Sequence, residues 1–181
     1  MVKLESKLVT RRNKIGILGG SFDPAHKGHL TISKEAIKRF KLRNVIWAIT
    51  KKNPFKKKNK TKLITRIKFA KKIIGLNKFI KIRFYENKIK SNKTINLIKF
   101  LLKKNKNTEI YFIMGADNLI SFHKWKKYNV IIDLCKILVF DRDGYKSKSM
   151  KSLSFKKYNK KGLEFIKFKK VNISSSKLRK I

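Results

Sequence analysis

Short apolar runs alternate with amphipathic stretches along the chain. The runs have the length of buried strands and cover residues 14–20, 45–50, 78–85, 109–115, 135–141 and 163–171. Between them, apolar residues recur at helical spacing and predict helices over residues 29–41, 63–74 and 94–104. Strands separated by helices of about a dozen residues are typical of βαβ units. The pattern therefore predicts an α/β fold, a doubly wound, Rossmann-like parallel sheet with helices on both faces.

Apolar and polar positions also predict details of these elements. The expected core positions of the first two helices are Leu30, Ile32, Ala36, Ile37 and Phe40, then Leu63, Ile64, Ile67, Ala70 and Ile74. Thr94 is the expected N-cap of the third helix, because its hydroxyl can accept a hydrogen bond from a helical N–H.

The remaining segments give weaker patterns. Residues 116–134 predict one or two short helices, residues 142–162 form a polar stretch rich in Ser, Lys and Asn, and residues 174–180 begin a terminal helix. We find no internal repeat and no linker long enough to divide the chain. We therefore expect a single domain over residues 1–181, with its core over about 14–181.

The turn after the first predicted strand has an unusual composition. It reads GGSFDPAHKGHL over residues 19–30 and holds two of the chain's three histidines. Such a strand-to-helix turn directs free backbone N–H groups and the positive end of a helix dipole at one spot, and glycine lets an anion approach that backbone. The turn therefore predicts a phosphate site. Residues 50–58 and 115–118 follow strands in the same way, so we expect them at the same edge of the sheet.

The chain is strongly basic. It has 50 Lys and Arg against 10 Asp and Glu, a formal net charge of +40. The lysines are spread along the chain rather than gathered in one tail, which favours a composition bias over a dedicated nucleic-acid surface. We expect non-specific adhesion to polyanions, and a basic nucleic-acid-binding protein remains the alternative from a different class.

Other features of the sequence bear on the role of the cysteine and on the cellular compartment. Cys135 is the chain's one cysteine and lies in an apolar run, so we expect a buried structural thiol rather than a nucleophile. No apolar window has the length of a membrane span, and the first residues lack the apolar core of a signal peptide. We expect a cytoplasmic protein with no membrane partner.

Four motifs together resemble the nucleotidyltransferase superfamily with its H-x-G-H motif and, more narrowly, the bacterial nicotinate mononucleotide adenylyltransferases. They are GGSFDPAHKGHL, the Trp47 strand that leads to NP, GADNLISFHKW, and ISSSKLR near the end, and the likeness runs from about Lys14 to Arg179. The resemblance implies transfer of AMP from ATP to nicotinate mononucleotide. The products would be nicotinate adenine dinucleotide and pyrophosphate, in a step of NAD biosynthesis.

The resemblance also implies roles for individual residues. His26 and His29 would bind the ATP phosphates and stabilise the charge of the transition state. The likeness assigns ATP contacts to Gly19, Gly20, Ser21, Phe22, Ser175 and Arg179, and substrate contacts to Thr94, Asp117, Trp125 and Lys57. Asp117 would contact ribose and Trp125 would stack on the pyridine ring, although ordinary core packing of Trp125 is a rival interpretation. We expect His123 at the surface.

The chemistry fits these residue types. A substrate phosphate that attacks the α-phosphorus of ATP in line needs no protein nucleophile, so positioning and charge stabilisation carry the catalysis. Mg²⁺ is expected to arrive with ATP, held by phosphates and water, and no residue is assigned as a metal ligand. We expect the acid substrate to be preferred over the amide, because Thr94 and backbone N–H groups beside Trp125 can donate to a carboxylate.

The sequence departs from the family pattern at two places. Where N-P-P-H-K is usual, residues 53–57 read NPFKK, and where Y-T-x-D-T-L is usual, residues 93–98 read KTINLI. The chain also stops two residues after Arg179, which leaves assembly open, with a homo-oligomer among the options. The rival within the superfamily is phosphopantetheine adenylyltransferase, which shares H-x-G-H and an ISSS segment but lacks the G-G-S-F-D-P-x-H form.

Overall fold

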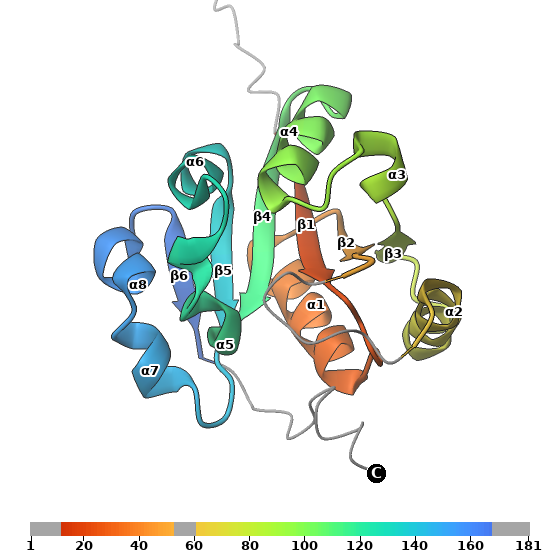
Figure 1. Cartoon of the computed structure of the whole chain (residues 1–181), viewed down its shortest axis with the longest axis horizontal. Coiled ribbons are helices and arrows are strands. Elements are labelled where there is room, and N and C mark those ends of the chain that lie inside the picture. Colours follow the sequence, from red (N-terminus) through yellow and green to blue (C-terminus); the bar gives the residue numbers. More distant parts are fainter. Residues whose placement is uncertain (1–11, 53–60, 168–181) are drawn as a thin grey trace, which may run out of the picture.

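The computed structural model describes residues 12–52 and 61–167, and within them six strands form one parallel sheet. The strands are β1 (Asn13–Gly20), β2 (Asn44–Ile49), β3 (Ile80–Arg83), β4 (Thr108–Gly115), β5 (Lys136–Phe140) and β6 (Leu163–Ile166). Their order in the sheet is β3-β2-β1-β4-β5-β6 (Figure 1). The predicted doubly wound α/β fold is confirmed, and the strand order reverses between β1 and β4.

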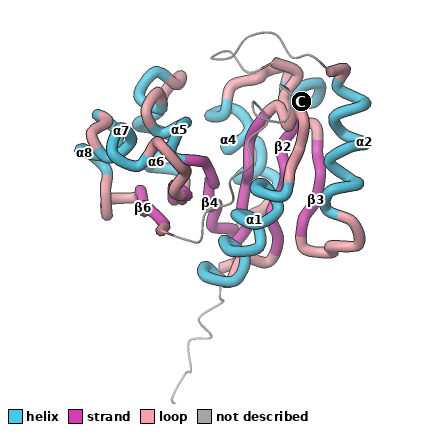
Figure 2. Tube along the Cα trace, turned by 90° about the horizontal axis from the view of Figure 1, so that it is seen from below, coloured by secondary structure: helices cyan, strands magenta, loops and turns pink. Residues whose placement is uncertain are grey.

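Helices cover both faces of this sheet. They are α1 (Lys27–Phe40), α2 (Leu63–Ile74), α3 (Glu86–Ile89), α4 (Thr94–Lys104), α5 (Ala116–Leu119), the 3₁₀ turn η1 (Phe122–Lys124), α6 (Tyr128–Leu134), α7 (Lys146–Met150) and α8 (Leu153–Tyr158). Apolar side chains of α1 and α2 pack on one face, and those of α4, α5, α6 and α8 on the other. Figure 2 shows α2 beside β3, while α7 and α8 lie at the opposite edge beside β6.

The two cores follow from strand alternation. In β4, Ile110, Phe112 and Met114 join the core under α4, whereas Tyr111 and Ile113 join the core under α1. Because both faces are covered, the strand reads as a continuous apolar run, which is the pattern expected for a buried parallel strand. No helix within the described ranges is long and apolar enough to cross a membrane.

The buried face of helix α2 differs from the prediction at one position. Ile64, expected in the core, is 69% exposed, whereas Arg66 is only 3% exposed. The stripe that faces the core runs through the half-buried Leu63 and the buried Arg66 and Ala70, at spacings of three and four residues. An arginine can occupy such a stripe only where its N–H groups find acceptors, which they do here.

Other boundaries also differ from the predictions. Thr94 is the first residue of α4 rather than its N-cap, which is Lys93 and makes no cap hydrogen bond through its side chain. The third strand spans four residues rather than the predicted eight. Residues 116–134 hold three short turns of helix instead of one or two, and α3, α7 and α8 were not predicted, because helices of four to six residues are too short to show a period.

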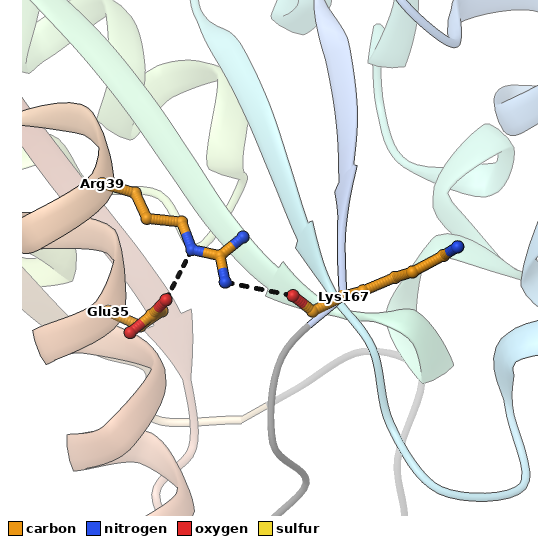
Figure 3. A network of polar contacts seen from close by, with 3 residues as sticks. All are labelled: Glu35, Arg39 and Lys167. Carbon is orange, nitrogen blue, oxygen red and sulfur yellow. Dashed lines mark hydrogen bonds and ion pairs between the residues drawn. The ribbon is translucent and has the colours of Figure 1, made fainter.

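The end of β6 is tied to α1. Arg39 of α1 donates to the carbonyl of Lys167, 3.2 Å away, and is also paired with Glu35 one turn earlier (Figure 3). The chain therefore leaves the sheet beside the helix that begins at the H-x-G-H turn.

Candidate active site

A cavity of about 310 Å³ lies at the carboxyl edge of the sheet. The ends of three strands line it with Gly19, Gly20, Ala48, Ile49, Thr50, Phe112 and Met114. The opposite wall includes Tyr85, Glu86, Ser91, Lys93, Thr94, Leu97, Asn118, Lys124, Trp125 and Lys126. The cavity thus sits where β1 meets β4 and the strand order reverses, the place where ligands bind in doubly wound sheets.

The H-x-G-H turn begins α1. His26 is the N-cap residue, with extended backbone, and the backbone N–H of His29 donates to the carbonyl of His26 at 2.9 Å. The two imidazole rings lie 3.8 Å apart between centroids. Both side chains are half-buried, and they stand beyond Ser21 in the same turn whose first residues, Gly19 and Gly20, line the cavity.

The hydrogen bond of His29 fixes its tautomer. Nδ1 of His29 accepts from the backbone N–H of His26 at 3.2 Å. A nitrogen that accepts cannot carry the proton, so the neutral ring is protonated at Nε2. His29 therefore caps α1 with one nitrogen and is a donor with the other.

Buried residues hold this turn from beneath. Phe22 has a left-handed backbone (φ 49°), and its ring stacks on Trp47 at 4.9 Å and lies 4.8 Å from the His29 ring. Trp47 donates to the hydroxyl of Ser33 at 2.8 Å, and that hydroxyl donates to the carbonyl of His29 at 2.8 Å. The position of His29 is therefore set by the buried core of β2 and α1.

Thr94 and Trp125 both line the cavity. Thr94 is the first residue of α4, and Trp125 follows η1. The Trp125 ring meets Phe112 and Phe122 edge-on, at 5.9 and 5.2 Å between centroids. Trp125 thus packs against the core and lines the cavity at the same time. Core packing and a binding role are therefore compatible for this residue.

Asp117 lies next to the cavity rather than in its wall. Oδ2 of Asp117 accepts from Nη1 of Arg142 at 2.6 Å, while Oδ1 is buried and has no hydrogen-bond partner within the described ranges. Gly115 makes room for this carboxylate, because a Cβ at that position would lie 2.6 Å from Oδ1. The neighbouring Asn118 lines the cavity instead.

Arg66 is a buried residue at this edge that the sequence analysis missed. Its guanidinium donates to the carbonyls of Ser21, Thr50, Lys51 and Thr61. Burial lowers the pKa of Arg66 below its ordinary value, and the charges of Asp23 and Glu86 oppose this shift. The signal in the sequence was its helical spacing from Leu63 and Ala70, which places it on the apolar face.

Two further polar groups lie in the cavity wall: Glu86, which the sequence analysis missed, and Thr50, which begins the predicted loop over residues 50–58. Glu86 accepts from the backbone N–H of Lys51 at 3.1 Å, and burial raises the pKa of its carboxyl group despite the nearby charges of Lys51 and Arg66. The hydroxyl of Thr50 is buried and finds no hydrogen-bond partner in the described part of the chain. Both groups are therefore placed to meet a polar ligand.

The structure describes most but not all of the predicted site residues. It brings Gly19, Gly20, Thr94 and Trp125 into one cavity, with Ser21, Phe22, His26 and His29 in the adjoining turn. Lys57, Ser175 and Arg179 lie outside the described residues, as does the predicted terminal helix. His123, expected at the surface, is half-buried, and its Nδ1 has no hydrogen-bond partner in the described ranges.

Cys135 is a buried thiol, as predicted. Its Sγ lies 3.2 Å from the carbonyl of Ile131 one turn back, and burial raises its pKa to about 12. A buried thiol with a raised pKa agrees with the structural role predicted for Cys135.

Comparisons with known proteins agree with this geometry. The sequence matches the cytidylyltransferase-like family over residues 17–181. A protein of Pelagibacter ubique named probable nicotinate-nucleotide adenylyltransferase is 66% identical over 181 residues, which is 100% of both chains. A protein of the same name from Nitratiruptor sp. is 39% identical over 134 residues, covering 74% of this chain and 76% of the relative.

The fold has a solved counterpart. The nicotinic acid mononucleotide adenylyltransferase of Plasmodium falciparum, in complex with NaAD, superimposes with a TM-score of 0.75. The match covers 93% of this chain and 83% of that chain at 21% identity. At this identity the likeness concerns the fold, and it supports the same doubly wound architecture.

Proposed function

Because this chain belongs to the cytidylyltransferase-like family and, within it, to the nicotinate-nucleotide adenylyltransferases, we propose that it transfers AMP from ATP to nicotinate mononucleotide. The proposal rests on the position of the cavity next to the turn that bears the two histidines. The cavity that holds Thr94 and Trp125 shares Gly19 and Gly20 with the turn that bears His26 and His29. A pyridine nucleotide in the cavity and a triphosphate on the turn would meet at these glycines.

The turn suits the triphosphate. The first N–H groups of α1, a helix of 14 residues, and the Nε2–H of His29 are donors at one place. We assign His26 and His29 to the phosphates, where they would stabilise negative charge as it develops. A phosphate oxygen of nicotinate mononucleotide then forms a bond to the α-phosphorus, the bond between that phosphorus and the bridging oxygen breaks, and pyrophosphate leaves with the electron pair.

The cavity suits the pyridine nucleotide. The aromatic ring of Trp125 offers a surface for a pyridine ring. Thr94 supplies a hydroxyl at the start of α4, where the first backbone N–H groups have no partner within the helix. Lys93, Lys124 and Lys126 also line the cavity, so a carboxylate on the ring meets donors and positive charge.

Mg²⁺ is proposed as a companion of ATP. Within residues 12–52 and 61–167, no three side chains of His, Cys, Asp or Glu gather as a metal cage, and the carboxylate of Asp117 is engaged by Arg142. This donor set fits an ion carried by phosphate oxygens and water, which is the usual coordination of Mg²⁺ on a nucleotide. The ion would neutralise charge on the triphosphate. Since the reaction consumes ATP, we place it in the cytoplasm.

Three substrates, each tested as the acceptor of AMP, distinguish the candidate reactions. Purified protein is incubated with ATP, Mg²⁺ and one of nicotinate mononucleotide, nicotinamide mononucleotide or phosphopantetheine, and pyrophosphate is measured. We expect the highest kcat/KM with nicotinate mononucleotide. Turnover with phosphopantetheine alone would assign the chain to the rival activity, and turnover with none of the three would refute the proposal.

A further inference from the structure

We propose that Arg66 is a positioning residue for the adenylyl transfer, one that holds the phosphate-binding turn against the end of β2. This inference rests on the function proposed above, because it concerns the geometry of the same site. Arg66 does not line the cavity, so its effect would pass through the main-chain carbonyls that it binds.

The guanidinium joins three separate segments of the chain. Nη1 donates to the carbonyl of Ser21, which follows β1, and to that of Thr50, which follows β2, at 2.8 Å for the latter. Nη2 donates to Lys51 at 3.2 Å. Nε donates to Thr61, just before α2, at 3.1 Å. Four of the five N–H donors of the guanidinium are thus bound to main-chain carbonyls.

Two of these carbonyls, those of Ser21 and Thr50, belong to segments that form the proposed site. Ser21 lies between Gly20, which lines the cavity, and Phe22, whose ring contacts His29. Thr50 lines the cavity, and its N–H donates to the carbonyl of Gly20 at 3.0 Å. Arg66 and this hydrogen bond therefore brace the two strand ends against each other directly beneath the turn that bears the histidines.

Lysine cannot replace this brace. An ammonium group presents its donors from one point, whereas the planar guanidinium spreads five over a rigid fork that reaches several acceptors at once. The charge itself is not what the site requires from Arg66, since lysines are abundant around it. We therefore expect Arg66→Lys to preserve the charge and to release part of the turn.

Steady-state kinetics of folded Arg66 variants distinguish a positioning role of Arg66 from an effect on stability alone. Arg66→Lys and Arg66→Gln are compared with wild type at a temperature where near-UV circular dichroism shows each to be folded. We expect kcat to fall on the order of 10 to 100-fold, the cost of a small misplacement of reacting groups, while the KM for ATP changes less than about threefold. Arg43→Lys is the matched control, because Arg43 is exposed and precedes β2 at the other edge of the sheet; its kcat should not change. A kcat within about twofold of wild type in both folded Arg66 variants would overturn the proposal.

A second readout does not depend on the activity. The chain has three histidines, so their ring resonances can be followed by NMR and assigned with His123→Gln. We expect Arg66→Lys to shift the signals of His26 and His29 and to leave that of His123 unchanged. If wild type proves inactive, this shift still tests the brace, and unchanged signals for both His26 and His29 would overturn it.

Discussion

His29 uses its two ring nitrogens differently. Nδ1 closes the first turn of α1 by accepting from His26, so Nε2 is left as the donor. A single side chain thus contributes to the helix cap and, in the proposed reaction, to charge stabilisation. These two contributions can be separated by substitution.

We expect His29→Ala to lower kcat by roughly 10² to 10³-fold, the usual loss for one donor to a developing charge. His29→Asn should give a similar loss, because an asparagine oxygen can accept in place of Nδ1 but offers no donor in the place of Nε2. Steady-state rates with thermal unfolding of each variant are the measurement. If His29→Asn kept the wild-type kcat, the cap rather than the donor would explain the need for a histidine.

We expect Glu86 to make the stability of the protein depend on pH. Burial raises the pKa of its carboxyl group above the ordinary value of 4.5, so the native state binds the proton more tightly than the unfolded state. As the pH rises from that ordinary value through the raised value, this group therefore lowers the free energy of unfolding. Glu86→Gln keeps an oxygen for the N–H of Lys51 and lacks the titration.

The stability of Glu86→Gln relative to wild type should therefore increase as the pH rises above the ordinary carboxyl pKa of 4.5. Urea unfolding of both proteins across this range measures the difference. Stability curves that stay parallel would show that the burial of Glu86 has no energetic consequence.

Sequence reasoning at the level of residues succeeded where a motif was local. Gly19, Gly20, Thr94 and Trp125 were predicted and share one cavity. It missed Arg66 and Glu86, because each contacts segments that are distant in the sequence. For Arg66, the acceptor carbonyls of Ser21 and Thr50 become neighbours only once β1 and β2 pair.

At the level of elements, we propose that the start of α4 contributes to substrate choice. Thr94 and Lys93 line the cavity at this helix N-terminus, and Trp125 lies in the same wall. A helix N-terminus favours negative charge. The acid substrate differs from the amide by a carboxylate, so α4 should favour the acid.

We expect kcat/KM to be at least tenfold higher for nicotinate mononucleotide than for nicotinamide mononucleotide. Tenfold corresponds to about 1.4 kcal/mol, which is within the contribution of one charge-assisted hydrogen bond. Thr94→Val removes the hydroxyl at nearly constant volume and should narrow the ratio, with Thr65→Val on α2 as a control. Equal values for the two substrates would contradict the assignment of α4 while leaving adenylyl transfer intact.

Long helices could be predicted from the sequence, and short helices could not. The 12 residues of α2 and the 11 of α4 lie within the predicted ranges, since each contains three turns of apolar period. The five residues of α7 and the six of α8 give no such period. In α2, four of the five predicted core positions pack on the core, whereas Ile64 is exposed and the buried Arg66 was not predicted.

At the scale of the whole molecule, topology brings the site together. Residues near 20, 50, 94 and 125 meet because parallel strands place their carboxyl ends at one edge and the order reverses between β1 and β4. The alternation of strands and helices was sufficient to predict this edge as the ligand site. The positions of Asp117 beside the cavity and of His123 within the fold required the structure.

The net charge of +40 is also a property of the whole molecule. We expect DNA and RNA to bind through released counterions, with affinity that falls steeply with salt and does not depend on sequence. Fluorescence anisotropy with unrelated duplexes across a salt series measures this. Strong sequence preference at near-physiological salt, in a protein that makes no pyrophosphate, would instead favour the nucleic-acid-binding alternative.

We propose that this edge of the sheet is where AMP from ATP is joined to a pyridine nucleotide. The decisive experiment is chromatographic identification and quantification of all products formed from ATP, Mg²⁺ and nicotinate mononucleotide. We expect one nicotinate adenine dinucleotide and one pyrophosphate for each ATP consumed. Release of phosphate or AMP without a dinucleotide, or no consumption of ATP by the folded protein, would contradict it.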